Sequence, residues 1–227
     1  MEKTEAEKIA RIKNRKRTNI LHQPEFVVIE YLCKILPLWM TPNFLTGIGF
    51  AGSIICFVGI LLAIENKHFM ILSVIGLAVQ WFGDSLDGRI AYYRNSPRKW
   101  YGWVLDMNLD WISTALIAIS LYYYLPSNKF IAVFFLSGYG LTYILAIMRY
   151  KITDIYLIDA DGLLGPTELR IVTSLALLGE IFIPNCLFFF GVIASIIIYF
   201  MDFFEFRKIL KLADQRDKRE LSEKNAK

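Results

Sequence analysis

The chain has 227 residues, of which 56% are hydrophobic and 15% aromatic, and its formal net charge is only +4. So high an apolar content excludes an ordinary soluble domain, and so small a charge argues against nucleic acid as a partner. The length allows about six membrane-spanning helices of about 20 residues each. We therefore expect one all-α integral membrane domain and no second, soluble domain.

The N-terminal 19 residues carry seven basic and three acidic residues and lack the apolar core of a cleavable signal peptide. We expect this end to be retained and to lie in the cytoplasm, where membrane proteins collect Lys and Arg. Residues 24–36 mix apolar and charged side chains, which favours an interfacial amphipathic helix over a short buried packing helix. Residues 1–40 are thus predicted to be a basic segment followed by an interfacial helix.

Six apolar runs predict a six-helix membrane domain over residues 41–206. The second run continues through an acidic motif to about Ala91, and the fifth follows the polar stretch 165–168, as expected for helices whose cytoplasmic ends line a cavity. The runs are Asn43 to Ile64, Phe69 to Phe82, Leu105 to Leu125, Phe130 to Met148, Leu169 to Ile183 and Asn185 to Phe204.

Basic residues gather at both chain ends and between the second and third runs, whereas the links near Lys67 and Lys129 are nearly bare of charge. An even number of spans fits this pattern. We expect both termini and the acidic motif on the cytoplasmic side of a multi-pass protein in the inner membrane of the cell. The charged tail, 207–227, is expected to be a solvated helix or a disordered tail.

The cysteines and histidines give no sign of a site. Cys33, Cys56 and Cys186 lack metal-ligand spacing, so we expect buried thiols that fill space. His22 and His68 have no chemical partner nearby in the sequence. A histidine-based mechanism is therefore unsupported.

Four aspartates at the ends of apolar runs form the main functional signal. Asp84 and Asp87 are three residues apart and Asp106 and Asp110 are four apart, so each pair shares a helix face. The short basic link predicts that the two helices are antiparallel neighbours, which brings four carboxylates together near one membrane face. Such a cluster needs cations, and oxygen ligands favour Mg²⁺ or Mn²⁺, in one or two ions.

Small residues lie between these acids. Gly88, Ala91 and Gly102 leave space for close approach of a backbone or a ligand, although helix packing alone would also explain Gly88 and Ala91.

The acidic motif resembles the signature of the CDP-alcohol phosphotransferase (CDP-alcohol phosphatidyltransferase) family, Asp-x2-Asp-Gly-x2-Ala-Arg-x8 or 9-Gly-x3-Asp-x3-Asp. One fixed position differs: Tyr92 stands where the signature has arginine, and Arg89 or Arg94 would have to supply that charge. Pro42-Asn-Phe-Leu-Thr46 resembles a second family element, and Gly165-Pro-Thr-Glu168 resembles one of the aminoalcohol branch. The matching signature positions are Asp84, Asp87, Gly88, Ala91, Gly102, Asp106 and Asp110.

The resemblance implies an enzyme of phospholipid biosynthesis, which moves a substituted phosphate group from a CDP-linked donor to an alcohol acceptor and releases CMP. By that analogy Asp84, Asp87 and Asp106 are core metal ligands, and Asp110 is the general base and a further ligand. Two Mg²⁺ or Mn²⁺ ions are implied. Gly88, Ala91 and Gly102 would then make room for the cytidine and the diphosphate.

Four further residues are candidates for contacts with a phosphate or with the acceptor. Arg149 and Arg170 would anchor a phosphate or an anionic lipid, unless they only follow the positive-inside bias. Lys151 is a weaker candidate of the same kind. Glu168 would contact a polar acceptor or cap the helix that it begins.

Alternatives to the preferred donor, CDP-diacylglycerol, remain open. One is transfer from CDP-choline or CDP-ethanolamine to a diglyceride, and the other is a non-catalytic membrane protein that binds divalent cations. We also expect a homodimer, because glycines such as Gly47, Gly49, Gly52, Gly138 and Gly140 permit close helix contacts.

Overall fold

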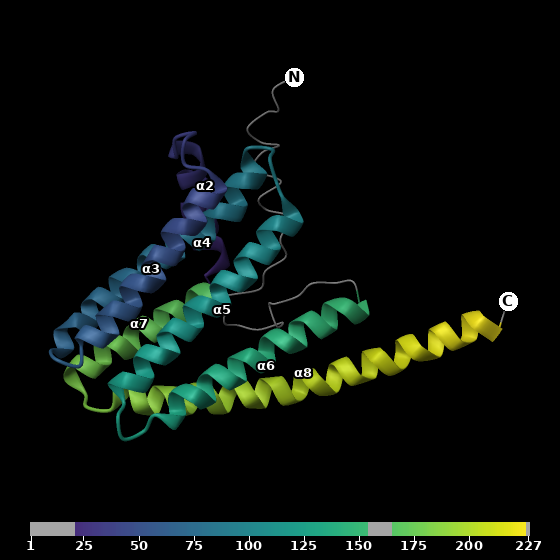
Figure 1. Cartoon of the computed structure of the whole chain (residues 1–227). Helices are drawn as coiled ribbons and strands as arrows, with labels where there is room; N and C mark the ends of the chain where they lie inside the picture. The colour runs from purple at the N-terminus through teal and green to yellow at the C-terminus, as the bar shows by residue number, and fades with distance from the viewer. Residues whose placement is uncertain (1–20, 154–164, 226–227) are drawn as a thin grey trace.

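The computed structural model describes residues 21–153 and 165–225, and within them all regular structure is helical, as predicted (Figure 1). Short turns join most helices, and some pairs of successive helices pack side by side. The elements are α2 (His22–Ile35), α3 (Pro42–Leu62), the 3₁₀ turn η1 (Lys67–Phe69), α4 (Met70–Tyr93), α5 (Lys99–Tyr124), α6 (Phe130–Thr153), α7 (Pro166–Phe182) and α8 (Cys186–Asn225).

Five of the described helical segments are long and apolar enough to cross a membrane: α3, η1 with α4, α5, α6 and α8. The chain therefore has the character of a multi-pass membrane protein. The fifth apolar run does form a helix, α7, but with 17 residues it is not among these five. Six spans thus remain a prediction. As expected, α4 continues through Asp84 and Asp87 to Tyr93.

Glycines bring α3 and α4 into backbone contact. A Cβ on Gly83 would lie 2.3 Å from the backbone nitrogen of Gly49, and one on Gly52 would lie 2.4 Å from that of Gln80. No side chain fits at such distances, so these glycines allow the two helices to pack closely. Gly49 and Gly52, suggested above for a dimer, are therefore used within the chain. The contact also places Asp84, which follows Gly83, directly beside α3.

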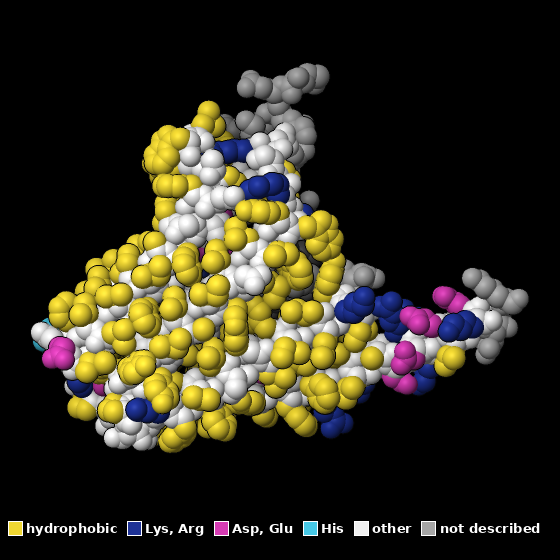
Figure 2. Space-filling view, viewed as in Figure 1, with side chains coloured by type: hydrophobic (Ala, Val, Ile, Leu, Met, Phe, Trp, Pro, Cys, Tyr) yellow, Lys and Arg dark blue, Asp and Glu magenta, His cyan; other side chains and the backbone are white. Residues whose placement is uncertain are grey.

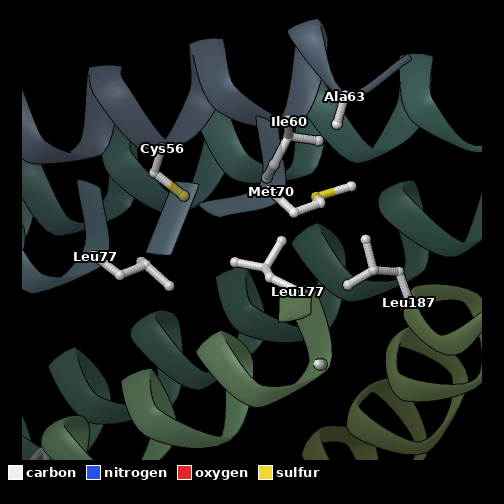
Figure 3. Packing of buried hydrophobic residues seen from close by; sticks show 8 residues of the cluster. Cys56, Ile60, Ala63, Met70, Leu77, Leu177 and Leu187 are labelled. Atoms are coloured by element: carbon white, nitrogen blue, oxygen red, sulfur yellow. The ribbon is translucent and has the colours of Figure 1, made fainter. Parts of the chain in front are cut away.

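A buried apolar cluster joins α3, α4, α7 and α8 on the side of the bundle away from the acidic motif. Figure 3 shows Ile60, Met70 and Leu177 pointing towards one another, with Cys56 and Leu187 at the edges. In a membrane these side chains leave lipid rather than water, so close van der Waals packing supplies the stabilisation. The cluster holds α7 against the α3–α4 pair.

A buried carboxylate fastens the same end of the bundle. Glu180 of α7 accepts hydrogen bonds from the Lys67 ammonium (3.3 Å), the Tyr124 hydroxyl (3.1 Å) and the backbone N–H of Leu187 (2.8 Å). Donors from η1, α5 and α8 thereby satisfy one acid, which ties four elements together.

α6 and α8 run side by side and lean away from α3, α4 and α5 (Figure 1). The last apolar run was predicted to end at Phe204, but α8 continues to Asn225, so the described part of the charged tail is helical. Figure 2 shows hydrophobic side chains over most of the visible face and charged ones along the free end of α8. Arg216 holds this extension to the end of α6 through the carbonyls of Lys151 and Ile152.

One face of α2 packs on the bundle, and the other remains apolar and exposed. Ile29 and Cys33 are buried against Leu86 and Ile90 of α4. Burial raises the pKa of the Cys33 thiol to about 11. Cys33 and Cys56 are buried, as predicted, whereas Cys186 is only half-buried.

Candidate metal and catalytic site

Three of the four aspartates converge at one place. Asp84 on α4 and Asp106 and Asp110 on α5 each offer a carboxylate oxygen, and these oxygens all lie within 4.8 Å of one another. The helices carry them there in a different way from the one predicted: α5 packs mainly against α3 and makes little direct contact with α4. The space left between α4 and α5 is the pocket.

This pocket contains about 270 Å³ of empty space between α3, α4 and α5. Its wall combines the four aspartates with small, polar and apolar side chains, so a charged group can enter beside the acids. The lining residues are Thr46, Gly49, Phe50, Ser53, Gln80, Asp84, Asp87, Asp106, Leu109, Asp110 and Ser113.

Asp87 lines the pocket but stands outside the group of three. The Thr46 hydroxyl donates a hydrogen bond to its Oδ2 at 2.6 Å, and the backbone N–H of Gly88 donates to its Oδ1. Near it, the Asn43 amide oxygen accepts a hydrogen bond from Arg98 at 2.6 Å. The Pro-Asn-x-x-Thr element at the start of α3 thus contributes directly to the site, because its threonine orients Asp87.

Arg170 is the cation that the fold brings to the cluster. Its guanidinium forms an ion pair with Asp84, although 86 residues separate the two in the chain. One arginine beside Asp84, Asp106 and Asp110 leaves an excess of negative charge. Carboxylates that close repel one another unless further cations are bound. The donor set, oxygen without thiolate or imidazole, fits a hard divalent ion such as Mg²⁺ or Mn²⁺.

The three small residues of the motif differ in their surroundings. A Cβ on Gly88 or Gly102 would meet nothing within 4 Å, so both adjoin open space. Ala91 is 8% exposed and packs inside the bundle. The first two therefore leave room near the acids, whereas Ala91 also has a packing role.

Glu168 caps α7. Its Oε2 accepts the backbone N–H of Gly165 at 3.0 Å, and its Oε1 accepts that of Leu21 at 2.8 Å. The side chain is 7% exposed. The bond to Gly165 is the half of a capping box in which the third helical residue accepts the N-cap N–H, so the carboxylate has a structural role there.

Arg149 lies on α6 and is paired with Glu205 of α8 at 2.6 Å. It does not line the pocket that holds the four aspartates. The structure thus separates Arg149 from Arg170, the other arginine proposed for anion binding.

The arginines near Tyr92 hold α2 in place. Arg89 pairs with Glu25 at 3.5 Å. Arg94 donates to four backbone carbonyls between α2 and α3, those of residues 36, 37, 38 and 40. Tyr92 itself is 41% exposed. Both arginines therefore serve the attachment of α2 rather than the pocket.

Three polar residues of the pocket were not predicted from the sequence. Gln80 and Ser113 lie one helical turn from Asp84 and Asp110 on the same helix faces, so the spacing that grouped the aspartates would have found them. Ser53 comes from α3, and no local pattern marks it.

Comparison with known protein families gives one match. The model of the CDP-alcohol phosphatidyltransferase family matches residues 39–204, well over half of the chain. The matched region contains all four aspartates and the helices that carry them. No curated protein matches the chain. On the extent of this match, the chain belongs to the CDP-alcohol phosphatidyltransferase family.

Proposed function

We propose that the protein transfers a substituted phosphate group from a CDP-linked donor, with CDP-diacylglycerol as the first candidate, to an alcohol and releases CMP. Membership of the family implies a phosphotransferase of phospholipid synthesis. The observation that carries the proposal is the convergence of Asp84, Asp106 and Asp110 in one pocket. An acidic group in a membrane-spanning bundle is costly without a function or a counter-ion.

The three convergent carboxylates and Asp87 would hold Mg²⁺ or Mn²⁺, two ions in our proposal. Bound there, divalent ions neutralise charge on the diphosphate and on the leaving CMP. Asp87 is already oriented by Thr46 at 2.6 Å. Gly88 and Gly102, which adjoin open space, would leave room for the nucleotide.

Asp110 is the proposed general base. It would accept the proton of the acceptor hydroxyl while the acceptor oxygen bonds to the phosphorus distal to cytidine, and the bond from that phosphorus to CMP breaks. Tyr143 of α6 lies near Asp110 and would orient it through its hydroxyl. Arg170, next to Asp84, would bind a phosphate oxygen.

The alternatives have less support. The Gly165 to Glu168 element, which suggested an aminoalcohol substrate, begins α7 with the cap that Glu168 forms, so its likeness has a structural explanation. A non-catalytic role was suggested by Tyr92, yet the four signature aspartates and the pocket are intact. Arg149, paired with Glu205, is the weaker anion-binding candidate of the two arginines.

For the membrane, we propose that α7 is the sixth span. Its 17 residues extend about 26 Å, only slightly less than the hydrocarbon core of a bilayer. Both termini and the site would then lie on the cytoplasmic side of the inner membrane. α2 would lie in the membrane interface, anchored there by the exposed side chains of Val27, Tyr31, Ile35 and Trp39. Homodimerisation remains a prediction.

The test is CMP release by the purified protein in lipid with Mg²⁺ or Mn²⁺. CDP-diacylglycerol is offered with inositol, inositol phosphate, glycerol phosphate or serine, and CDP-choline or CDP-ethanolamine is offered with diacylglycerol. We expect metal-dependent release with CDP-diacylglycerol and one acceptor, and a fall of about 10²–10⁴-fold in Asp110→Asn.

The matched control is Asp214→Asn, the same substitution on the exposed end of α8, where Asp214 pairs with Lys218. It should leave CMP release unchanged. Full activity of Asp110→Asn would refute the base assignment. Absence of CMP release in every pairing, from folded protein, would refute the transferase.

A further inference from the structure

The acidic pocket has uncharged polar groups on the side away from the chain link between α4 and α5, and the proposed mechanism does not use them. Ser53 of α3, Gln80 of α4 and Ser113 of α5 line the pocket there. Gln80 precedes Asp84 by one helical turn and Ser113 follows Asp110 by one turn. Because α4 and α5 run in opposite directions (Figure 1), both lie on the same side of the acids. We call Ser53, Gln80 and Ser113 the polar floor.

Ser113 has a hydroxyl that the described part of the fold does not use. Its side chain is only 4% exposed and lines the pocket. The described residues offer it no hydrogen-bond partner. The other four buried serines each donate to a backbone carbonyl, at 2.7–3.4 Å: Ser53, Ser73, Ser120 and Ser195. A buried hydroxyl without a partner is unfavourable, so Ser113 is available to a ligand in the pocket.

Gln80 and Ser53 determine what kind of group fits beside Ser113. The Gln80 amide also has no partner among the described residues, so it can both donate and accept. The Ser53 hydroxyl donates to the Gly49 carbonyl at 3.4 Å and keeps its capacity to accept. An ester carbonyl only accepts, and a phosphate is charged. The polar floor is therefore complementary to an uncharged group that donates and accepts, which is a hydroxyl.

We propose that the polar floor binds a second hydroxyl group of the alcohol acceptor, so that the acceptor is a polyol. The inference rests on the proposed function, in which Asp110 takes the proton of the reacting hydroxyl. Ser113 lies on the same face of α5, with its Cβ about 5–6 Å from that of Asp110. A hydroxyl near the reacting one thus reaches the floor. A water molecule has the same hydrogen-bonding capacity, and the experiment distinguishes the two sources.

Acceptors that differ by one hydroxyl test the polar floor. CMP release is measured in phosphatidylcholine nanodiscs with CDP-diacylglycerol and Mg²⁺ or Mn²⁺. Glycerol phosphate is compared with the hydroxypropyl phosphate that lacks its middle hydroxyl, and inositol with its monodeoxy analogues. We expect the loss of the second hydroxyl to lower kcat/KM about 10–100-fold, because groups of the floor are then left without a partner.

Ser113→Ala is the sharpest variant, because it removes only a hydroxyl that no described residue uses. It should lower kcat/KM for glycerol phosphate about tenfold or more and leave hydroxypropyl phosphate nearly unchanged, so that the ratio between the two acceptors falls towards one. Gln80→Met should act in the same direction. The matched controls are Ser120→Ala, a buried serine of α5 outside the pocket, and Gln215→Met on the exposed end of α8. Both controls should keep the wild-type ratio.

An equal fall for both acceptors in Ser113→Ala would overturn the proposal, because the floor would then hold a water molecule or only support packing. Efficient turnover of an acceptor with a single hydroxyl, such as serine or diacylglycerol, would also overturn it.

If no substrate pair releases CMP, melting temperatures with CMP and Mg²⁺ present decide the matter. Greater stabilisation by glycerol phosphate than by hydroxypropyl phosphate, with the difference lost in Ser113→Ala, would leave the floor as a hydroxyl site while the proposed transferase fails. No difference between the two compounds would refute both.

Discussion

The two ends of the bundle each hold acidic groups, which have opposite surroundings: Glu180 is buried, whereas Asp84, Asp106 and Asp110 are half-buried. Glu180 is one carboxylate with three donors from three elements, all inside the chain. At the other end, Asp84, Asp106 and Asp110 lie close together, Arg170 forms an ion pair with Asp84, and the three carboxylates border a pocket. A buried acid with sufficient donors stabilises the fold, whereas acids in excess of their donors indicate a binding site.

The largest expected effect is on the acidic pocket. Asp106→Asn should lower CMP release by about 10³-fold, because it removes one of the convergent ligands. The melting temperature should not fall, since the substitution also relieves repulsion between like charges. Activity and thermal unfolding in detergent measure both quantities. A destabilised Asp106→Asn would place this acid with Glu180, as a structural group.

The reverse outcome is expected at Glu180. Glu180→Leu leaves the Tyr124 hydroxyl and the Leu187 N–H unpaired, and should lower the free energy of unfolding by about 2–4 kcal/mol. The Lys67 side chain is 43% exposed, so its ammonium can turn to water, and the loss of this ion pair adds little to the destabilisation. Residual folded protein should retain its activity per molecule. Glu180→Gln, which keeps an acceptor, should be milder; an unchanged melting temperature in Glu180→Leu would contradict the structural role.

Divalent ions should distinguish the two ends. Mg²⁺ or Mn²⁺ at 100 times its Kd should stabilise the wild-type protein by about 2.7 kcal/mol, and a chelator should reverse the gain. Glu180→Gln should show the same increment and Asp106→Asn little of it. Melting temperatures with and without metal measure this. An equal increment in all three proteins would mean that the ion binds elsewhere.

The smallest expected effect concerns the orientation of Asp87. Thr46→Val removes the hydroxyl that donates to Asp87 at 2.6 Å and should slow CMP release about tenfold, the equivalent of one charged hydrogen bond. Thr46→Ser keeps the donor and should retain most of the rate. Steady-state kinetics of the three proteins test this. Equal rates for Val and Ser would show that Asp87 needs no such support.

The predictable part of the site was local. Spacings of three and four residues placed each pair of aspartates on one helix face, and the same rule carried α4 through the motif to Tyr93. Apolar content and run length predicted a helical membrane protein, and five described segments qualify as spans. Helical periodicity and hydropathy depend on residues close together in the chain, so both can be predicted from a single sequence.

The remaining features depend on packing between distant segments. The ion pair of Arg170 with Asp84 joins residues 86 apart in the chain, and no sequence pattern in either segment predicts it. The sequence predicted that α4 and α5 are neighbours but not that α5 packs mainly on α3, which is itself in backbone contact with α4. The structural role of Glu180, which lies in an apolar run, was not predicted, because its hydrogen-bond donors come from η1, α5 and α8.

The backbone contact between α3 and α4 also determines which wall of the pocket can adjust. Where a Cβ on Gly83 would come within 2.3 Å of the opposite backbone, there are no side chains whose rotation could let the two helices slide. The α3–α4 pair is therefore one stiff unit, which carries Thr46, Asp84 and Asp87. Asp106 and Asp110 lie on a second unit, α5. We expect substrate entry and product release to change the distance between these two units, so that the site is assembled and released by the movement of one helix.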